Sequence, residues 1–434
     1  MEASTHALRR VAFASFAGSA IEFYDFFIYG TAAALVFPKV FFPHLGPTMA
    51  TVASLGAFAS AFVARPVGGA VFGHFGDRIG RKRTLVVTLM VMGLSTLGVG
   101  LIPSAATIGL AAPALLVVLR LLQGFAAGGE WAGAALLGSE YAPETRRGFY
   151  GMFPQLGIGA ALLMSSTAFL VTYTALGKTS AAFLSWGWRI PFLLSAVLIG
   201  IALFVRLRVR ETPAFTAARP HADVPVAGLV RGQPFQLVLA SGAAVGIFAM
   251  SYMAGTYFSN YAVSQLGYSE DVVLLVGVLT GVVSLGVIGA SAMLSDRFGR
   301  RRMIATGFAL AVPWSFVMLP LIDTRNPVLF GVAIVGTFGI IGISSGPIAA
   351  FLPLVFPTRY RYTGTGLAYN LGGIIGGAIP PVISPVLLVT YGGWAIGVMM
   401  AGTALVSLVS VALLRENVEP VLASECRPSV CESV

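Results

Sequence analysis

The chain has 434 residues, of which 57% are hydrophobic and 10% charged, and its formal net charge is +10. A soluble globular domain usually carries about 25% charged residues, so this composition excludes a soluble enzyme and a disordered protein. The two cysteines, Cys426 and Cys431, both lie near the C-terminal end. That placement excludes a disulfide-stabilised secreted scaffold, and we expect no metal site.

Apolar runs in the sequence predict twelve membrane-spanning helices. A spanning helix needs roughly 20 mainly apolar residues, and only helices or closed barrels can cross a bilayer. The runs lack the alternation of barrel strands, which favours helices. In chain order they cover residues 16–37, 50–72, 84–103, 110–138, 149–174, 189–207, 236–260, 271–294, 303–322, 327–354, 363–390 and 393–414. The expected fold is an all-α integral membrane bundle.

Lys and Arg are concentrated on one side of these predicted spans. If the N-terminus is inside, the inner segments hold 21 of the 27 Lys and Arg residues and the outer segments hold four. Because cytoplasmic loops of membrane proteins are enriched in Lys and Arg, we expect both termini in the cytoplasm. The basic loops would face the anionic lipid bilayer, which explains the net charge without a nucleic-acid partner. We expect a multi-pass monomer of the bacterial inner (cell) membrane.

One pattern occurs twice in the chain. Residues 73–83 read GHFGDRIGRKR and residues 292–302 read AMLSDRFGRRR, and their aspartates, Asp77 and Asp296, are 219 residues apart. A repeat at about half the chain length predicts two six-helix halves in the same orientation. The predicted segments are a cytoplasmic N-terminal tail (1–15), a first half (16–207), a cytoplasmic linker (208–235), a second half (236–414) and a cytoplasmic C-terminal tail (415–434).

The doubled loop resembles the signature of the major facilitator superfamily. Further stretches are EFYDFF at 22–27, RPVGG at 65–69, RLLQG at 120–124, GGEW at 128–131, WGWRIP at 186–191, FPTRYRYTG at 356–364 and LAYN at 367–370. In these stretches the chain resembles the metabolite:proton symporter family of that superfamily. The run from 42 to 78, together with GGEW and FLSWGW at 183–188, is most similar to the shikimate permeases. The resemblance implies twelve transmembrane helices and transport by alternating access. The sequence has no phosphate-binding G-x-x-x-x-G-K-[ST] motif, and we expect no cofactor.

Charged residues inside the predicted spans are candidates for function, because each costs at least ~2.5–3.5 kcal/mol to insert. There are five: Glu22, Asp25, Arg65, Arg120 and Glu130, all in the first half. We expect Asp25, Glu22 and Glu130 to take part in proton coupling, together with Arg120, since burial favours the neutral form of a carboxylate. The alternative is that they only form structural ion pairs. For Arg65 we favour a side chain that extends to the membrane surface.

Neutral polar side chains in the second half indicate a substrate site. Tyr252, Thr256 and Asn260 are spaced four residues apart, so they share one helix face. The alternative is hydrogen bonding between helices. The expected substrate-binding residues are Arg120, Gln155, Tyr252, Thr256, Tyr257, Asn260, Tyr369 and Asn370.

The loops that carry the repeat are expected to gate the cytoplasmic side, as the resemblance implies. The expected gating residues are Asp77, Arg78, Arg81, Glu140, Arg147, Asp296, Arg297 and Arg300. The family often has an acid three residues before the proline of the FPTR segment, but Leu354 stands there in this chain. We therefore expect a lopsided latch, in which replacing Asp77 is more harmful than replacing Asp296.

Together these features predict proton-coupled secondary uptake (symport) of a small organic metabolite, specifically a carboxylate such as a shikimate-like anion. The alternatives are uptake of dicarboxylates, citrate or zwitterionic osmolytes, and proton-coupled drug antiport. A membrane sensor would need an output domain, and an enzyme would need a catalytic constellation facing water; neither is visible in the sequence. The C-terminal tail has no heptads, which argues against the osmosensing branch of the family.

Overall fold

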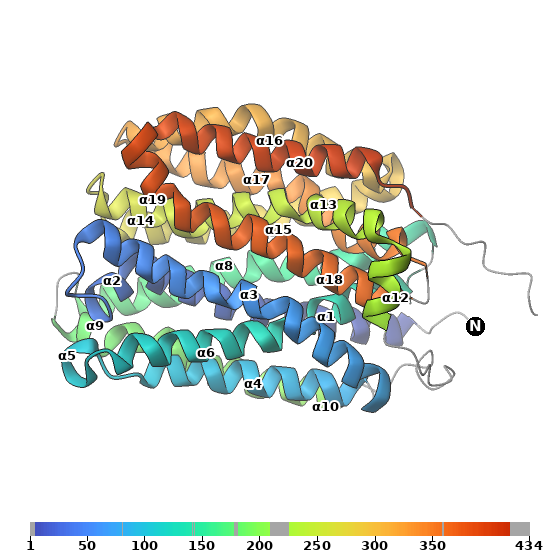
Figure 1. The fold of residues 1–434 in the computed structure, drawn as a ribbon, viewed down its shortest axis with the longest axis horizontal. Coiled ribbons are helices and arrows are strands. Elements are labelled where there is room, and N and C mark those ends of the chain that lie inside the picture. The colour runs from blue at the N-terminus through green and yellow to red at the C-terminus, as the bar shows by residue number, and fades with distance from the viewer. Residues whose placement is uncertain are drawn as a thin grey trace, which may run out of the picture.

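The computed structural model describes residues 5–79, 81–140, 142, 144–177, 181–208, 225–357 and 360–416, and all regular structure in these ranges is helical. Eleven helices within this part are long and apolar enough to cross a membrane. α1 (Thr5–Leu35) adds a further helix of 31 residues, which carries Glu22 and Asp25. The long helices run side by side in one elongated bundle (Figure 1). The predicted all-α membrane fold is confirmed.

The first half follows the predicted spans with one difference. Its long helices are α1, α3 (Pro47–Ile79), α4 (Arg81–Leu101), α6 (Ala111–Ala127), α7 (Trp131–Glu140), α8 (Arg147–Leu176) and α10 (Ile190–Arg208). Its short elements are α2 (Phe37–Val40), α5 (Ala105–Ile108), η1 (Glu144–Arg146), α9 (Ala181–Ser185) and η2 (Gly187–Arg189). The fourth predicted span is interrupted at residues 128–130, where two consecutive glycines weaken the helix.

The second half begins after the linker, whose last part forms α12 (Pro225–Gly232). Its helices are α13 (Pro234–Tyr252), α14 (Phe258–Ser264), α15 (Glu270–Phe298), α16 (Arg300–Asp323), α17 (Pro327–Phe351), η4 (Leu352–Val355), α18 (Arg361–Gly373), α19 (Ile379–Tyr391) and α20 (Gly393–Leu413). Two π-helical turns, η3 (Met253–Tyr257) and η6 (Ile374–Ala378), lie inside the seventh and eleventh spans. Such turns occur often at functional sites.

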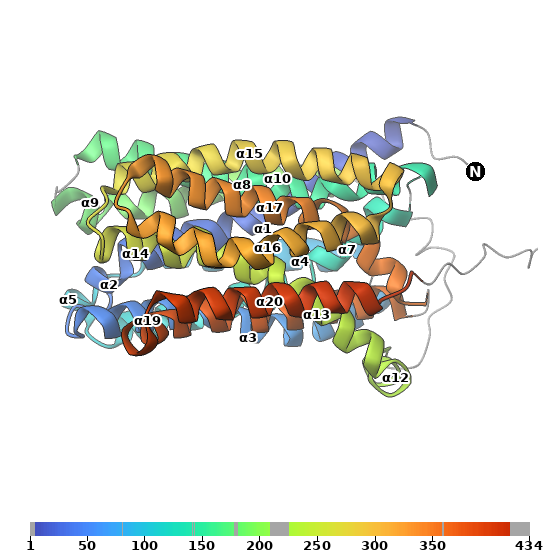
Figure 2. The same ribbon diagram turned by 90° about the horizontal axis from the view of Figure 1, so that it is seen from above.

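The two halves meet along paired helices. α8 of the first half lies beside α15 of the second half along most of its length (Figures 1 and 2). Glycines make this close approach possible: a Cβ atom on Gly281 would lie 2.6 Å from the backbone nitrogen of Leu163. In a membrane the lipid tails are as apolar as the side chains, so the hydrophobic effect does not drive helices together. Close van der Waals packing does, and small residues allow it.

Both halves begin at the same end of the bundle. The start of α1, α12 and the end of α20 lie at one end, and α2, α5 and α9 lie at the other (Figure 1). We call the first the termini end and the second the opposite end. This arrangement places an even number of spans in each half, as the repeat in the sequence predicts.

Candidate transport site

All five charged side chains predicted inside the spans are buried. The exposed fraction is 0% for Glu22, Arg65, Arg120 and Glu130 and 1% for Asp25. The expectation that Arg65 extends to the membrane surface is therefore wrong. Arg65 lies on the inward face of α3, where it pairs with a carboxylate of α1 instead of reaching lipid.

Glu22 and Arg65 form a buried ion pair that reaches the second half. Arg65 Nη2 donates to Glu22 Oε1 at 2.7 Å, and Arg65 Nε donates to Asn370 Oδ1 at 3.1 Å. Asn370 Nδ2 in turn donates to the backbone carbonyl of Gly128 at 2.9 Å. One amide side chain of the second half thus connects the ion pair with the interruption between α6 and α7. Removing one partner of a buried ion pair leaves an uncompensated charge, which is strongly destabilising.

Asp25 is linked to Arg120 through two polar side chains. Thr96 Oγ1 donates to Asp25 Oδ2 at 2.8 Å, and Gln123 Nε2 donates to Thr96 Oγ1 at 2.6 Å. Arg120 Nη1 donates to Gln123 Oε1 at 3.2 Å. Among the described residues, Asp25 Oδ1 has no hydrogen-bond partner. Each of the three hydrogen bonds is donated in the direction of the Asp25 carboxylate. The charged form of Asp25 is therefore favoured only while this chain of hydrogen bonds is intact.

Arg120 is held by aromatic faces and one carbonyl. Its guanidinium carbon lies 4.1 Å from the ring centre of Tyr29 and 4.3 Å from that of Phe26, and Nε donates to the Phe58 carbonyl at 3.3 Å. Phe26 also lies 4.9 Å from the guanidinium carbon of Arg65, so one ring contacts both cations. Arg120 Nη2 and Arg65 Nη1 have no hydrogen-bond partner within the described part of the chain. Both cations therefore have donors to offer an anion.

Glu130 lies between α6 and α7, in a region where backbones come very close. A Cβ atom on Gly128 would collide with the Arg65 carbonyl, and one on Gly129 would lie 2.6 Å from Phe72 Cβ. The two consecutive glycines therefore allow close packing of the helices here. The coupling role of Glu130 stays a prediction.

The predicted polar stripe of the seventh span faces α1. Tyr252, Thr256 and Asn260 are 2%, 1% and 5% exposed, so all three lie on one buried face. They contact α1 at Phe27, Gly30 and Ala34 respectively. The Thr256 hydroxyl has no hydrogen-bond partner among the described residues. The stripe is thus closed against α1 here, and its role in substrate binding stays a prediction.

Tyr257 packs within the second half. Its ring is parallel to that of Tyr261, with 6.2 Å between ring centres, and Tyr261 donates to Asp323 Oδ1 at 2.7 Å. The structure therefore places Tyr257 beside the opposite end and not on the stripe. A substrate contact at this residue remains a prediction.

Gln155 and Tyr369 meet around a tryptophan. Trp131 Nε1 donates to Gln155 Oε1 at 3.3 Å, and Gln155 Nε2 donates to the Ser345 carbonyl at 2.8 Å. The rings of Trp131 and Tyr369 are stacked, with 3.5 Å between their centres and an interplanar angle of 3°. The pair joins α7 of the first half to α18 of the second half.

Three residues of the site are missing from the sequence-based prediction: Thr96, Gln123 and Trp131. Each is a polar or amphipathic side chain within an apolar span, and all are at most 2% exposed. Polarity inside a span was the only available signal, but a neutral side chain costs less to bury than a charge and is therefore a weaker indicator.

Asp296 connects the two halves at the termini end. Its Oδ1 and Oδ2 accept hydrogen bonds from the backbone N–H groups of Gly148 and Phe149, at 2.7 and 3.0 Å. These groups belong to the first turn of α8, so Asp296 caps a helix of the other half. Arg300 Nη1 donates to Glu416 Oε2 at 3.2 Å, and Arg300 Nη2 lies 4.0 Å from Asp296 Oδ1.

The other predicted gating residues differ in exposure, and some of their side chains are not described. Arg297 is exposed and lies over the Phe298 ring, and Arg147 is half-buried. The side chains of Asp77, Arg78, Arg81 and Glu140 lie outside the described residues. Leu354 is buried in η4. The gating roles and the lopsided latch stay predictions.

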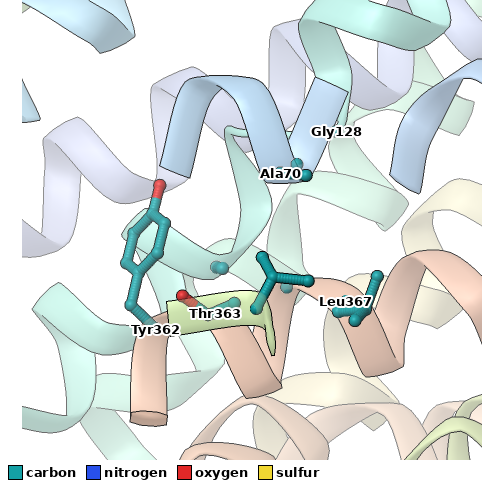
Figure 3. Close-up of a pocket in the computed structure, with 9 residues that line it drawn as sticks. Ala70, Gly128, Tyr362, Thr363 and Leu367 are labelled. Carbon is teal, nitrogen blue, oxygen red and sulfur yellow. The ribbon is translucent and has the colours of Figure 1, made fainter. Parts of the chain in front are cut away.

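Hydrogen bonds join the two halves at both ends of the bundle. At the termini end, Tyr362 donates to the Gly129 carbonyl at 2.8 Å, and at the opposite end Tyr173 donates to Glu270 at 2.7 Å. A small recess remains on each side. The one at the termini end is lined by α3, α7, α12 and α18, with Tyr362 and Leu367 on its wall (Figure 3). The other is lined by residues of α1, α8, η3, α15 and α17. The buried charges lie between the two recesses.

Two six-helix halves that meet around buried charges are an architecture that membrane transporters share. This is the class of protein that the fold and the site define. The chain belongs to the major facilitator superfamily, because the family model described as "Major Facilitator Superfamily" matches residues 15–380.

Known relatives agree with this assignment. The chain is 41% identical over 417 residues to the inner membrane metabolite transport protein YhjE of Escherichia coli (strain K12), with 94% of each chain covered. It is 36% identical over 420 residues to the shikimate transporter of the same strain, covering 94% of this chain and 95% of that protein. The structure of the proton:xylose symporter XylE bound to 6-bromo-6-deoxy-D-glucose shares the fold, with a TM-score of 0.76, 17% identity and coverage of 95% and 97%. The protein is a metabolite transporter and not an enzyme.

Proposed function

We propose that this transporter takes up a small organic carboxylate together with protons. The observation that carries the proposal is the contrast between its two α1 carboxylates. Glu22 is neutralised by Arg65 at 2.7 Å, whereas Asp25 is buried and accepts a hydrogen bond from a neutral hydroxyl. A buried carboxylate without a directly paired cation is the group whose protonation costs least. Asp25 is therefore the proposed proton site.

Protonation of Asp25 would release Arg120. A neutral Asp25 is a weaker acceptor for the hydrogen bonds that run through Gln123 and Thr96. The Thr96 hydroxyl has a second acceptor, the Met92 carbonyl, at 3.0 Å. Arg120 then has more donors available for an anionic substrate. Binding of proton and anion would thus support each other, as reciprocal coupling between sites requires.

The positive charge of the buried arginines and the substrate named for one relative both support the proposed substrate class. Arg65 and Arg120 are the buried cations, and each has a nitrogen without a hydrogen-bond partner in the described structure. Guanidinium groups bind carboxylates with directional, charge-assisted hydrogen bonds. A relative at 36% identity is a shikimate transporter. We therefore propose a carboxylate of the shikimate type, taken up across the bacterial inner membrane by a chain whose termini are cytoplasmic.

Uptake into proteoliposomes tests the proposal. Purified protein would be reconstituted and supplied with labelled shikimate, with an interior more alkaline than the exterior. We expect accumulation above the external concentration, and we expect a protonophore to abolish it. Uptake that is the same with and without the pH gradient, and with and without the protonophore, would contradict proton coupling. A panel with citrate, a dicarboxylate and a betaine would identify the class if shikimate is not accumulated.

A further inference from the structure

The stack of Trp131 on Tyr369 differs from ordinary aromatic packing. Aromatic pairs prefer offset or edge-to-face arrangements with ring centres 4.5–7 Å apart. These two rings are 3.5 Å apart and parallel within 3°. Face-to-face stacking brings the electron-rich faces together, so this pair is less favourable than an offset or edge-to-face pair, and separating it costs less.

Each ring is supported by its own half of the protein. Trp131 Nε1 donates to Gln155 on α8, which belongs to the first half. Tyr369 packs against Phe248 of α13 in the second half, with 4.7 Å between ring centres. When the halves part, both rings therefore keep their neighbours and their orientation. The result is two preformed, flat apolar surfaces that face each other.

The stack lies next to a cation with a free donor. Asn370, the neighbour of Tyr369 in the chain, accepts a hydrogen bond from Arg65. Phe248, which packs on Tyr369, also lies 5.9 Å from the guanidinium carbon of Arg65. Arg65 Nη1 has no hydrogen-bond partner within the described residues. A flat group between the rings would therefore place an attached carboxylate beside Arg65.

We propose that Trp131 and Tyr369 determine specificity: their faces, stacked when the termini end is closed, hold the flat ring of a cyclic carboxylate when the halves part. Arg65 takes the carboxylate, and the rings select an unsaturated or aromatic six-membered ring over an open chain. This inference rests on the proposed function, because it names the kind of carboxylate that is carried. It assigns Trp131 a role in the substrate site.

Three monoanionic hydroxy acids test the inference: shikimate with an unsaturated ring, quinate with a saturated ring, and gluconate with an open chain. Binding is measured by equilibrium dialysis of the full chain in detergent, which requires no proton coupling. We expect the order shikimate, quinate, gluconate. Trp131→Leu should lower the preference for shikimate over gluconate about tenfold, the effect of a strong aromatic contact. Trp131→Phe should keep most of it.

Matched variants make the outcome decisive. Tyr369→Leu should reproduce the loss and Tyr369→Phe should not, so the conclusion does not depend on one variant that folds poorly. Trp394→Leu is the control, since Trp394 is 66% exposed on α20. An unchanged preference in both leucine variants, or a parent protein that binds gluconate as well as shikimate, would overturn the inference.

Uptake experiments separate this inference from the proposed function. If the pH gradient drives uptake but the preference for shikimate over gluconate is unchanged in Trp131→Leu, the inference fails and the function stands. If ring binding depends on Trp131 but no pH gradient drives uptake, the inference holds and proton coupling fails.

Discussion

Asp25 and Arg120 communicate through Thr96 and Gln123, by hydrogen bonds of 2.8, 2.6 and 3.2 Å that all donate towards the carboxylate. A direct ion pair would hold both charges in place, whereas this relay contains a hydroxyl that has an alternative acceptor. In the proposed mechanism, the protonation state of Asp25 determines whether Arg120 is engaged or available. In this account, coupling depends on two neutral side chains as much as on the two charged ones.

The relay makes Thr96 essential for coupling. Thr96→Val keeps the shape of the side chain and removes the hydroxyl, so Asp25 loses its hydrogen-bond donor and Gln123 its acceptor. We expect gradient-driven uptake to fall about tenfold or more, because the loss of a buried hydrogen bond to a charged group costs about 1.5–3 kcal/mol. Thr96→Ser keeps the hydroxyl and should retain most uptake. Uptake by Thr96→Val that equals the parent rate would exclude the relay.

The Glu22–Arg65 pair should behave as one unit in stability measurements. Glu22→Gln alone leaves Arg65 buried without its counter-charge, which costs about 3–5 kcal/mol. A second change, Arg65→Gln, removes that charge and should recover part of the loss. Arg65→Lys should also be damaging, because an ammonium group cannot serve Glu22 and Asn370 in the same planar arrangement. Thermal unfolding in detergent compares the parent, the two single Gln variants, the double variant and Arg65→Lys, and additive effects of the two Gln substitutions would contradict the pairing.

The Asp296 cap should control the termini end. Asp296→Ala removes both acceptors for the first turn of α8, a loss of about 0.5–2 kcal/mol, so the halves should part more often at this end. Alkylation of a cysteine placed at the exposed Thr145, in a background without Cys426 and Cys431, reports that opening. We expect faster alkylation in Asp296→Ala and a smaller change in Asp296→Asn, which keeps one acceptor. Arg302→Gln, at an exposed residue outside the predicted gate, is the control, and equal rates in all variants would contradict a latch.

The two sequence repeats should contribute unequally to that latch. Leu354 stands where the family often has an acid, so the network in the first half is expected to matter more. Asp77→Asn should therefore lower uptake more than Asp296→Asn, measured as initial rates under one pH gradient. A larger effect of Asp296→Asn would mean that its cap on α8, and not the missing acid, determines the balance.

The sequence was sufficient for the fold and for the list of buried charges, but not for their partners. Hydropathy and the repeat predict the spans, because each spanning helix must be long and apolar enough to cross the same bilayer. Arg65 shows where this reasoning ends: in isolation a basic side chain in a span is expected to reach the surface, and only the tertiary packing of α1 on α3 brings Glu22 to it. Thr96 and Gln123 were missed for the same reason, since a relay exists only between helices.

Proton movement driven by substrate tests the central claim about Asp25 most directly. Weakly buffered proteoliposomes with a pH-sensitive dye inside receive substrate from outside, with no pH gradient imposed. The account predicts acidification of the interior with the parent protein. It predicts none with Asp25→Asn, which should still exchange labelled for unlabelled substrate, because exchange needs no net proton movement. Substrate uptake by the parent without acidification, or acidification that persists in Asp25→Asn, would contradict the account.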